Sequence, residues 1–357
     1  MNRGDLTKII EAGVAAPSGD NSQPWRFTAH DNSLEIFNIP NRDNPYYNFR
    51  QRGSFVAHGA VIENITISSR SLGYAPEIKL FPTGDLINGP VARINFHETK
   101  AEKDPLYEFI TERATNRKPY DSKRSLSEKQ RTDFLNATGN DTNIEFIFTE
   151  SQKDKSIIGQ AVSVNEIVAL ETEGLHKVFF ADMVWSQKEE EQKKSGLFIK
   201  TLELPLPIQL LFRGLRHWPF NNFLNKIGFA KIAAMGNAKI YASGSALGII
   251  TVTNQDAESF VNAGRLMQRI WLKATSMGLS VQPIAGMLFL AQRIKEGDAG
   301  QLAENHKLLI SSAYTKIENI FGIKNKTIAM LLRIGHASKP SARSSRKLPE
   351  INWSRTN

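Results

Sequence analysis

The sequence predicts a mixed fold of helices and strands, built from two halves that each contain one central helix. The main observation is an internal repeat: Phe55-Val56-Ala57-His58-Gly59 returns as Phe260-Val261-Asn262-Ala263-Gly264, 205 residues later. The same offset relates Gly73 to Gly278. Each copy is a helix with one glycine inside it and another at its end. Because an internal glycine costs a helix about 1 kcal/mol relative to alanine, two copies predict the same close helix contact twice, as in a pseudo-dimer.

A weaker repeat points to the same two halves. Leu126 to Phe148 has the order helix, polar loop, strand, and so does Asp5 to Phe27. The loop of the later copy, Thr138 to Asn143, lacks the Pro-Ser and Gln-Pro-Trp of the earlier one. If both halves once built a site, we expect one complete site to remain.

The first half alternates helix and strand signals. Asp5 is placed to cap an amphipathic helix, and Gly73 is placed to end a long one. Strands are expected where apolar and polar residues alternate. The expected elements are a helix from residue 5, strands at 25–29 and 34–39, a helix at 54–72, and strands at 77–81 and 91–97.

The second half contains more helix. Its expected helices are 105–114, 127–136, 153–172, 187–194, 257–277, 286–294 and 303–320, and its expected strands are 144–149, 238–252 and 327–334. A basic, Ser-rich tail follows. Residues 194–234 alternate apolar runs with basic residues, which fits a lid over a site, a patch on a membrane surface, or a helical insertion packed on the core.

The composition limits the chemistry. A chain of 357 residues without cysteine has no disulfide, thiolate metal site or cysteine nucleophile. The histidines lack metal-ligand spacing, and no dinucleotide-binding, phosphate-loop or serine-hydrolase motif is present. The net charge of +9 favours anionic partners such as a phosphate-bearing cofactor, while no recognition pattern supports nucleic-acid binding. No stretch reaches the roughly 20 apolar residues of a membrane span, and no secretory signal is evident, so we expect a cytoplasmic protein.

The stretch from Ala16 to Trp25 carries more specialised residues than a simple connection needs. Pro17 and Pro24 stiffen it, while Ser18, Asn21 and Gln23 offer hydrogen-bond donors and acceptors. A polar loop beside the ring of Trp25 suits a planar ligand rich in heteroatoms. The alternative is an ordinary helix-to-strand turn.

Three further clusters can bind an anion or approach a ligand. Arginine matches phosphate geometry, and a glycine after a strand allows close backbone approach. The alternatives are a solvated basic helix end and a disordered basic tail. The candidate residues are Arg113, Thr115, Asn116 and Arg117; Lys339, Arg343, Arg346 and Lys347; and Arg333, Gly335 and His336.

Together these residues resemble the FMN-dependent nitroreductase family. Ala16 to Trp25 is similar to the Pro-Ser-x-x-Asn motif of that family, and Arg113 to Tyr120 is similar to its Arg-x-Ser-x-Arg phosphate motif, with Thr115 in place of serine. The resemblance implies an α+β, three-layer sandwich. Because the motifs occur in reversed order in a long chain, it implies the branch in which two tandem halves form an intrachain pseudo-dimer, free as a monomer or paired as a homodimer.

The resemblance also implies a site for FMN. Pro17, Ser18, Asn21 and Gln23 face the flavin ring, and Pro283, Ile284 and Ala285 line it. The residues implied around the phosphate are Arg113, Thr115, Asn116, Arg117, Arg333, Gly335, Arg343 and Arg346. Tyr46, Tyr47 and His58 are candidates for a base, with a structural role as the alternative.

The activity implied is ping-pong hydride transfer from NAD(P)H or a small organic substrate to a nitro, quinone or enone acceptor, or dehydrogenation of a biosynthetic intermediate. One alternative is a catalytically silent protein of the same fold that binds or sequesters flavin. Another is a peripheral membrane or nucleic-acid binder, with membrane contact through 196–234. The expected division is a first half at 1–103 and a second at 104–357, with a lid or insertion at about 187–236.

Overall fold

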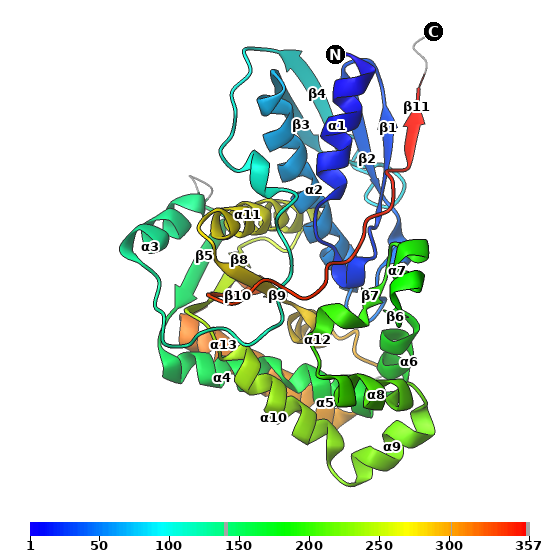
Figure 1. Cartoon of the computed structure of the whole chain (residues 1–357), viewed down its shortest axis with the longest axis vertical. Coiled ribbons are helices and arrows are strands. Elements are labelled where there is room, and N and C mark those ends of the chain that lie inside the picture. Colours follow the sequence, from blue (N-terminus) through cyan, green and yellow to red (C-terminus); the bar gives the residue numbers. More distant parts are fainter. Residues whose placement is uncertain (139–141, 301, 355–357) are drawn as a thin grey trace.

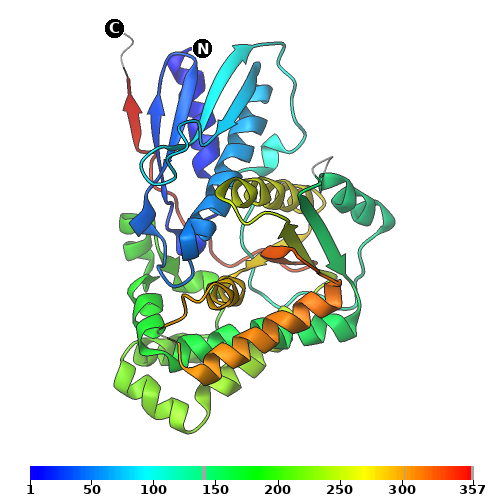
Figure 2. The same cartoon turned by 180° about the vertical axis from the view of Figure 1, so that it is seen from behind.

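The computed structural model describes residues 1–138, 142–300 and 302–354, and Figures 1 and 2 show it from two sides. Two large sheets, antiparallel except for one parallel edge pair, lie on either side of a pair of central helices. The N-terminal sheet has the strand order β11-β1-β2-β4-β3, and the other has the order β5-β8-β10-β9. In this described part of the chain no helix is long and apolar enough to cross a membrane.

The first sheet is formed by the beginning of the chain and by one short strand from its end. The strands are β1 (Trp25–Ala29), β2 (Ser33–Asn38), β3 (Tyr74–Leu80), β4 (Pro90–Glu98) and β11 (Ile351–Trp353). Two helices, α1 (Arg3–Val14) and α2 (Arg52–Ser71), pack beside it. Buried residues of β1 and β2 alternate with less buried ones, as expected for a sheet with one face on the core.

The second sheet is more deeply buried. Its strands are β5 (Ile144–Thr149), β8 (Ala246–Val252), β9 (Ser280–Ile284) and β10 (Thr327–Gly335), and its helices include α3 (Glu128–Leu135), α11 (Ala257–Ser276), α12 (Gly286–Lys295) and α13 (Glu304–Phe321). Every residue of β8 and of β10 is buried. The continuous apolar sequence of β8 follows from this burial on both faces.

The two sheets repeat one plan. In chain order, β1, β2, β3 and β4 correspond to β5, β8, β9 and β10, and both sets pair antiparallel with the same neighbours. Each central pair has one register irregularity, between Ile36 and Phe37 in the first sheet and between Ile328 and Met330 in the second. This confirms an α+β fold of two tandem halves.

The central helices α2 and α11 both span 20 residues and pack on each other. Both end before a glycine in the left-handed region, with φ of 87° at Gly73 and 70° at Gly278. The offset of 205 residues relates the two helices along their whole length.

Each half sends its last segment across to the other half. After β4 the chain crosses through residues 99–126 to α3 and β5, and after β10 the tail crosses back to pair β11 with β1 (Figure 1). The tail, for which disorder was one alternative, is therefore an ordered strap that ends in a strand. The sequence showed no sign of β11 because the strand is only three residues long.

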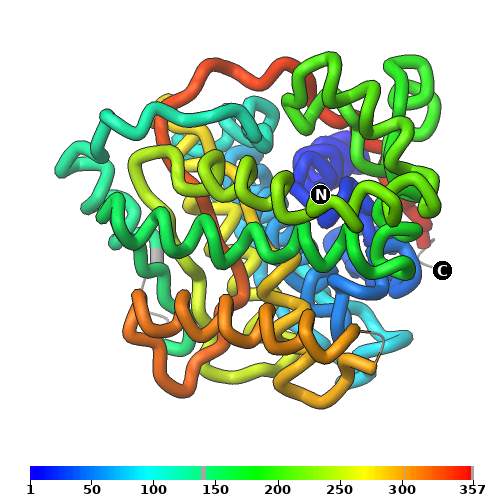
Figure 3. Tube along the Cα trace, turned by 90° about the horizontal axis from the view of Figure 1, so that it is seen from below, coloured from blue at the N-terminus to red at the C-terminus, as the bar shows by residue number. Residues whose placement is uncertain are grey.

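Between β5 and β8 the chain makes a helical layer that covers one end of the molecule (Figure 3). It contains α4 (Gln152–Val162), α5 (Val164–Glu171), α6 (Glu173–Ala181), α7 (Gln187–Lys193), α8 (Leu206–Leu215), α9 (Trp218–Lys226) and α10 (Phe229–Tyr241), with a small parallel pair of strands, β6 (Met183–Val184) and β7 (Leu197–Phe198).

Several expected elements differ from the structure. The α1 cap is Asn2, whose side chain accepts from the Asp5 backbone N–H, and Asp5 lies in the first turn. The helix expected at 105–114 is only a 3-10 turn at Tyr107–Phe109, and the strand expected at 238–252 begins at Ala246 because α10 continues to Tyr241. Of the polar loop noted at 138–143, residues 139–141 lie outside the described part.

Candidate functional site

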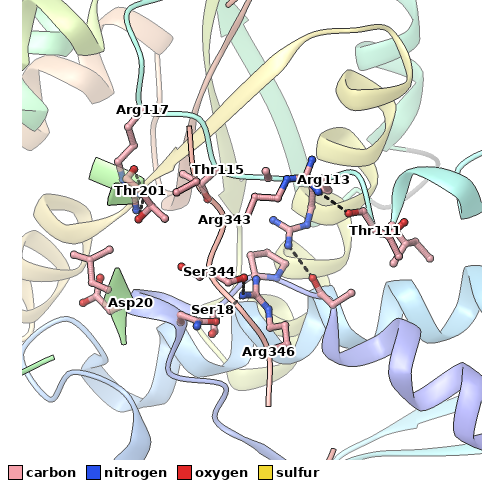
Figure 4. A pocket seen from close by; sticks show the side chains of 17 residues that line it. Ser18, Asp20, Thr111, Arg113, Thr115, Arg117, Thr201, Arg343, Ser344 and Arg346 are labelled. Atoms are coloured by element: carbon pink, nitrogen blue, oxygen red, sulfur yellow. Dashed lines mark hydrogen bonds between the residues drawn. The ribbon is translucent and has the colours of Figure 1, made fainter. Parts of the chain in front are cut away.

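A cavity of ≈ 260 Å³ lies where three segments far apart in sequence meet (Figure 4). They are the loop after α1, residues 110–117 of the first crossing segment, and residues 342–346 of the tail. Leu197 and Thr201 of the helical layer close one side. The lining includes these predicted site residues: Pro17, Ser18, Asn21, Arg113, Thr115, Arg117, Arg343 and Arg346.

The loop after α1 has an unusual backbone. Asp20, Asn21 and Gln23 all have positive φ, between 43° and 58°. The Ser18 hydroxyl accepts from the Gln23 backbone N–H at 3.0 Å and closes the loop. Non-glycine residues in this region cost roughly 1 kcal/mol or more each, and such strain tends to gather at binding sites. The loop is therefore a specifically shaped surface rather than a simple turn.

Three arginines crowd one end of the cavity. Arg113 donates to the Ala15 carbonyl at 2.8 Å and packs over the Trp271 ring at 4.5 Å, while its Nε–H has no partner. Burial lowers the pKa of Arg113 well below its usual value, and the charges of Arg346 and Arg343 lower it further. An anion placed here would relieve both the repulsion and the desolvation.

The tail arginines are held by backbone carbonyls. Arg343 donates to the carbonyls of Thr111 and Glu112, and Arg346 donates to the Ala16 carbonyl at 3.2 Å and to Asn21 Oδ1 at 2.7 Å. Burial lowers the pKa of Arg346 to about 10. The carbonyls at the end of α1 carry the negative end of the helix dipole, so they help to hold Arg346 and Arg113.

The opposite end of the cavity carries one acid and one base. Figure 4 shows Arg117, Thr201 and Asp20 on the side away from Arg113 and Thr111, with the tail residues between them. Arg117 donates to the Thr201 carbonyl at 3.1 Å. Burial raises the pKa of Asp20, and the Arg117 charge opposes that shift. The cavity therefore has one strongly cationic end and one nearly neutral end.

The two loop amides are already engaged by protein groups. Gln23 donates to the Lys194 carbonyl at 2.7 Å and accepts from the Lys347 backbone N–H at 2.9 Å. Asn21 donates to the Ser345 carbonyl at 3.0 Å. The structure thus joins this loop to the segment after α7 and to the tail.

Other predicted cofactor residues lie behind the cavity wall. Asn116 bonds the Ser280 hydroxyl and the Ser338 carbonyl. Arg333 is fully buried, with its guanidinium 3.8 Å above the Tyr120 ring; its terminal nitrogens donate to the Lys118 carbonyl and the Ser243 hydroxyl, and its Nε–H has no partner. Gly335 lets β10 pass Ser245, whose backbone nitrogen would lie 2.7 Å from an added Cβ. None of these three is among the residues that line the cavity.

Pro283, Ile284 and Ala285 form the end of β9 and the start of α12 and are half-buried. They are also not among the lining residues. Next to them, an added Cβ on Gly286 would lie 2.6 Å from Asn165 Oδ1, so α5 lies directly against this turn.

The three candidate bases are separate from the cavity. His58 is fully buried on α2, its Nε2 is 3.1 Å from Asn38 Oδ1, and burial lowers its pKa to about 3. It is therefore neutral at physiological pH. Tyr46 and Tyr47 are half-buried and pack against the core beneath α12 and α13, and burial raises the pKa of Tyr47.

A half-buried polar cluster was not predicted from the sequence. Glu166 of α5 accepts from the Tyr241 hydroxyl at 2.5 Å and from Asn237 Nδ2 at 3.0 Å, while its Oε2 has no partner. Burial raises the pKa of Glu166 to about 7. Asn165 Oδ1 is also unpartnered. Glu166 is one acid in an amphipathic helix, so no local signal distinguished it from a surface residue.

The model of the nitroreductase family matches residues 110–336. An uncharacterised protein of Mycobacterium tuberculosis is 24% identical over 361 residues, covering 95% of this chain and 47% of that relative. The chain thus spans about half the length of the curated relative it matches.

Solved structures with similar arrangements share little sequence with the chain. A nitroreductase with bound FMN from Bacteroides fragilis is 10% identical, with a TM-score of 0.35 over 69% of this chain and 95% of that one. An FMN-dependent nitroreductase of Mycobacterium smegmatis, solved with NADPH, is 12% identical, with a TM-score of 0.35 over 64% and 86% of the two chains.

Proposed function

Because this chain belongs to the nitroreductase family, we propose that it is an FMN-dependent oxidoreductase whose cofactor lies in the cavity between the two halves. The observation that supports this most is the convergence of Arg113, Arg343 and Arg346 at one end of that cavity. A phosphate there would receive charge-assisted hydrogen bonds from guanidinium groups that are otherwise mutually repelled. The unpartnered Nε–H of Arg113 fits that role.

The remaining lining residues would hold the rest of the cofactor. Pro17, Ser18 and Asn21 provide a shaped polar surface, and Thr115 and Arg117 reach the cavity from the crossing segment. In this proposal the loop of the first half faces the ring, while Arg113, Arg343 and Arg346 face the phosphate. Neither set would bind the cofactor alone, which agrees with a site built between halves at about 1–103 and 104–357.

The cavity is smaller than the roughly 300 to 1,000 Å³ typical of small-molecule sites. Its loop amides bond the Lys194 carbonyl, which belongs to the proposed lid at 187–236. We infer that this segment must move away from Gln23 before the ring can enter fully. The proposed lid would then also keep water from the site during turnover.

When bound, FMN would supply the hydride chemistry, so no protein nucleophile is required. NAD(P)H is the proposed reductant, and a nitro, quinone or enone compound, or a small biosynthetic intermediate, is the proposed partner substrate. The residues of this chain would bind, orient and shield. Arg117 and Asp20, at the nearly neutral end, are placed to contact a substrate rather than the phosphate.

A second candidate function is a catalytically silent protein that binds or sequesters flavin. It is favoured by the same contacts between Gln23, Lys194 and Lys347, which keep the ring-facing loop covered. The two functions share the phosphate contacts and differ in whether the helical layer lets a substrate reach the ring.

One set of measurements tests both. Purified protein is reconstituted with FMN, and its absorbance is followed before and after anaerobic NAD(P)H. We expect a flavin spectrum that bleaches, and about tenfold weaker FMN binding in Arg113→Ala, because one charge-assisted hydrogen bond contributes roughly 1.5 to 3 kcal/mol. Exposed Arg216→Ala is the control. Binding without bleaching or acceptor turnover would favour sequestration, and no binding would exclude both functions.

A further inference from the structure

The outer surface of α8, α9 and α10 carries exposed apolar residues that the proposed flavin site does not use. Eight of the fourteen large apolar side chains that are exposed in the described part of the chain lie between residues 206 and 235: Leu206, Ile208, Leu210, Phe220, Phe223, Ile227, Ile232 and Met235. We call this set the apolar helical surface. Scattered exposed apolar residues are ordinary, but a concentration on three adjacent helices marks an interaction surface.

The apolar residues follow helical spacing. On α9, Phe220 and Phe223 are 41% and 61% exposed and three residues apart, and Ile227, directly after the helix, is 69% exposed. On α10, Ile232 and Met235 are three residues apart, and Met235 is 67% exposed. Spacings of three and four residues place side chains on one face of a helix. Each helix thus presents an apolar stripe to solvent.

The charged side chains in and around α8, α9 and α10 are all basic. From Leu204 to Gln255 there is no aspartate or glutamate. The same stretch contains five basic residues, all exposed: Arg213, Arg216, Lys226, Lys231 and Lys239. Among the ion pairs of the described residues, none involves any of the five. The segment therefore combines an apolar stripe with uncompensated positive charge.

The place of these helices in the fold leaves them accessible. α8 packs on α9 and α9 on α10, so they form one continuous layer. Figures 1 and 2 both show this layer at the end of the molecule opposite the two termini. Short helices of 10, 9 and 13 residues are too short to span a bilayer, but they can lie along its surface.

We propose that the apolar helical surface docks on the surface of an anionic lipid bilayer. The apolar stripes would enter the boundary between headgroups and acyl chains, and the five basic residues would face anionic headgroups. A second copy of the chain is disfavoured as the occupant, because a symmetric contact would bring two sets of uncompensated positive charge together. Nucleic acid offers phosphates but no partner for the stripes of Leu, Phe, Ile and Met.

The docked surface connects to the cavity through a short stretch of chain. Thr201, which accepts from Arg117 and lines the cavity, lies five residues before α8.

The lipid proposal does not depend on flavin binding, and it is tested without flavin turnover.

The test is co-sedimentation of the full chain with vesicles of phosphatidylcholine alone and of phosphatidylcholine mixed with phosphatidylglycerol. We expect sedimentation with the mixed vesicles only, weakening as salt rises. Ile227→Ser should reduce that binding about tenfold, since it removes buried apolar area at the interface. Lys226→Gln combined with Lys231→Gln should reduce it and flatten its salt dependence.

Ile87→Ser is the matched control, because Ile87 is 73% exposed in the loop between β3 and β4 and undergoes the same change. It should bind vesicles as the unaltered protein does. Thermal melting confirms that each variant is folded. The proposal is overturned if the unaltered protein does not sediment with anionic vesicles or if the two serine variants behave alike. Loss of a dimer in Ile227→Ser, measured by analytical ultracentrifugation, would instead identify a second copy as the occupant.

Discussion

Gly59 of α2 and Gly264 of α11 occupy equivalent positions in a single helix crossing. A Cβ added to Gly59 would lie 1.9 Å from the Val261 carbonyl oxygen, and one added to Gly264 would lie 2.0 Å from the Val56 carbonyl oxygen. Val56 and Val261 are themselves related by the offset of 205 residues. The contact is therefore reciprocal, as in a symmetric dimer, although one chain makes both sides of it.

Gly59→Ala and Gly264→Ala should each destabilise the protein by about 3 kcal/mol. The added methyl meets backbone rather than a movable side chain, so the two central helices must separate. Thermal or denaturant unfolding measures the effect. We expect the two substitutions to lower the free energy of unfolding by the same amount, because the crossing is reciprocal.

Gly236→Ala is the matched control for this prediction. Gly236 lies inside α10, and an added Cβ would meet nothing within 4 Å. This change should stabilise the protein by roughly 1 kcal/mol, through helix propensity alone. If Gly59→Ala were as stable as Gly236→Ala, the close crossing would be wrong.

Asn21→Ala should weaken FMN retention while leaving the fold intact. The Asn21 side chain accepts from Arg346 and donates to the Ser345 carbonyl, so its loss frees the tail arginine from the cavity wall. We expect about tenfold weaker FMN binding, because a hydrogen bond to a charged group is lost. Fluorescence titration measures it. Asn41→Ala, at an exposed asparagine nearby, is the control, and equal affinity in both variants would contradict the assignment.

Much of the fold could be predicted from local signals. The helices around Gly59 and Gly264 and the strands β1, β5 and β10 follow from periodicity and terminal glycines. The helix expected at 105–114 failed because apolar spacing in Leu106 and Ile110 reflects burial under the central helices, not a regular helix. The secondary structure of such segments is decided by tertiary contacts, which the periodicity of apolar residues does not report.

The site was predictable only in part. Loop chemistry and arginine spacing singled out Ser18, Asn21, Arg113 and Arg117 because their segments carry residues that plain connections do not need, and all four line the cavity. Arg333 shows where prediction from sequence stops, because its guanidinium is buried beside Tyr120 and away from the lining residues. An arginine that satisfies buried carbonyls has the same sequence signal as one that binds phosphate.

Arg333→Lys should lower stability by about 3 kcal/mol without changing the FMN affinity of the folded protein. The guanidinium donates to Ser243 Oγ and to the Lys118 carbonyl, both at 2.9 Å, and an ammonium group cannot reproduce that planar set of donors. Unfolding and flavin titration are measured on the same sample. Arg70→Lys, at an exposed arginine, should change neither quantity. A selective loss of FMN affinity would assign Arg333 to the cofactor instead.

Glu166 should make the protein less stable as pH rises from about 4.5 to 7. Burial raises its pKa to about 7 in the folded chain, from an ordinary value of 4.5. Below pH 4.5 the carboxyl is protonated in both states. Between the two values the folded state binds more protons than the unfolded state, so stability falls by at most about 1.4 kcal/mol per pH unit. Above pH 7 the loss is complete.

Glu166→Gln should flatten this part of the pH profile, because glutamine keeps the hydrogen bond with Tyr241 and cannot ionise. The flattening should be partial, since burial also raises the pKa of Asp43 to about 7 and the pKa of Asp20 above its usual value, and Asp43→Asn should flatten the profile further. Melting temperatures at pH 5 and pH 7.5 give the measurement. Glu173→Gln, at an exposed glutamate, is the control. An unchanged slope in Glu166→Gln would show that this carboxyl is ionised in the folded protein across the whole range.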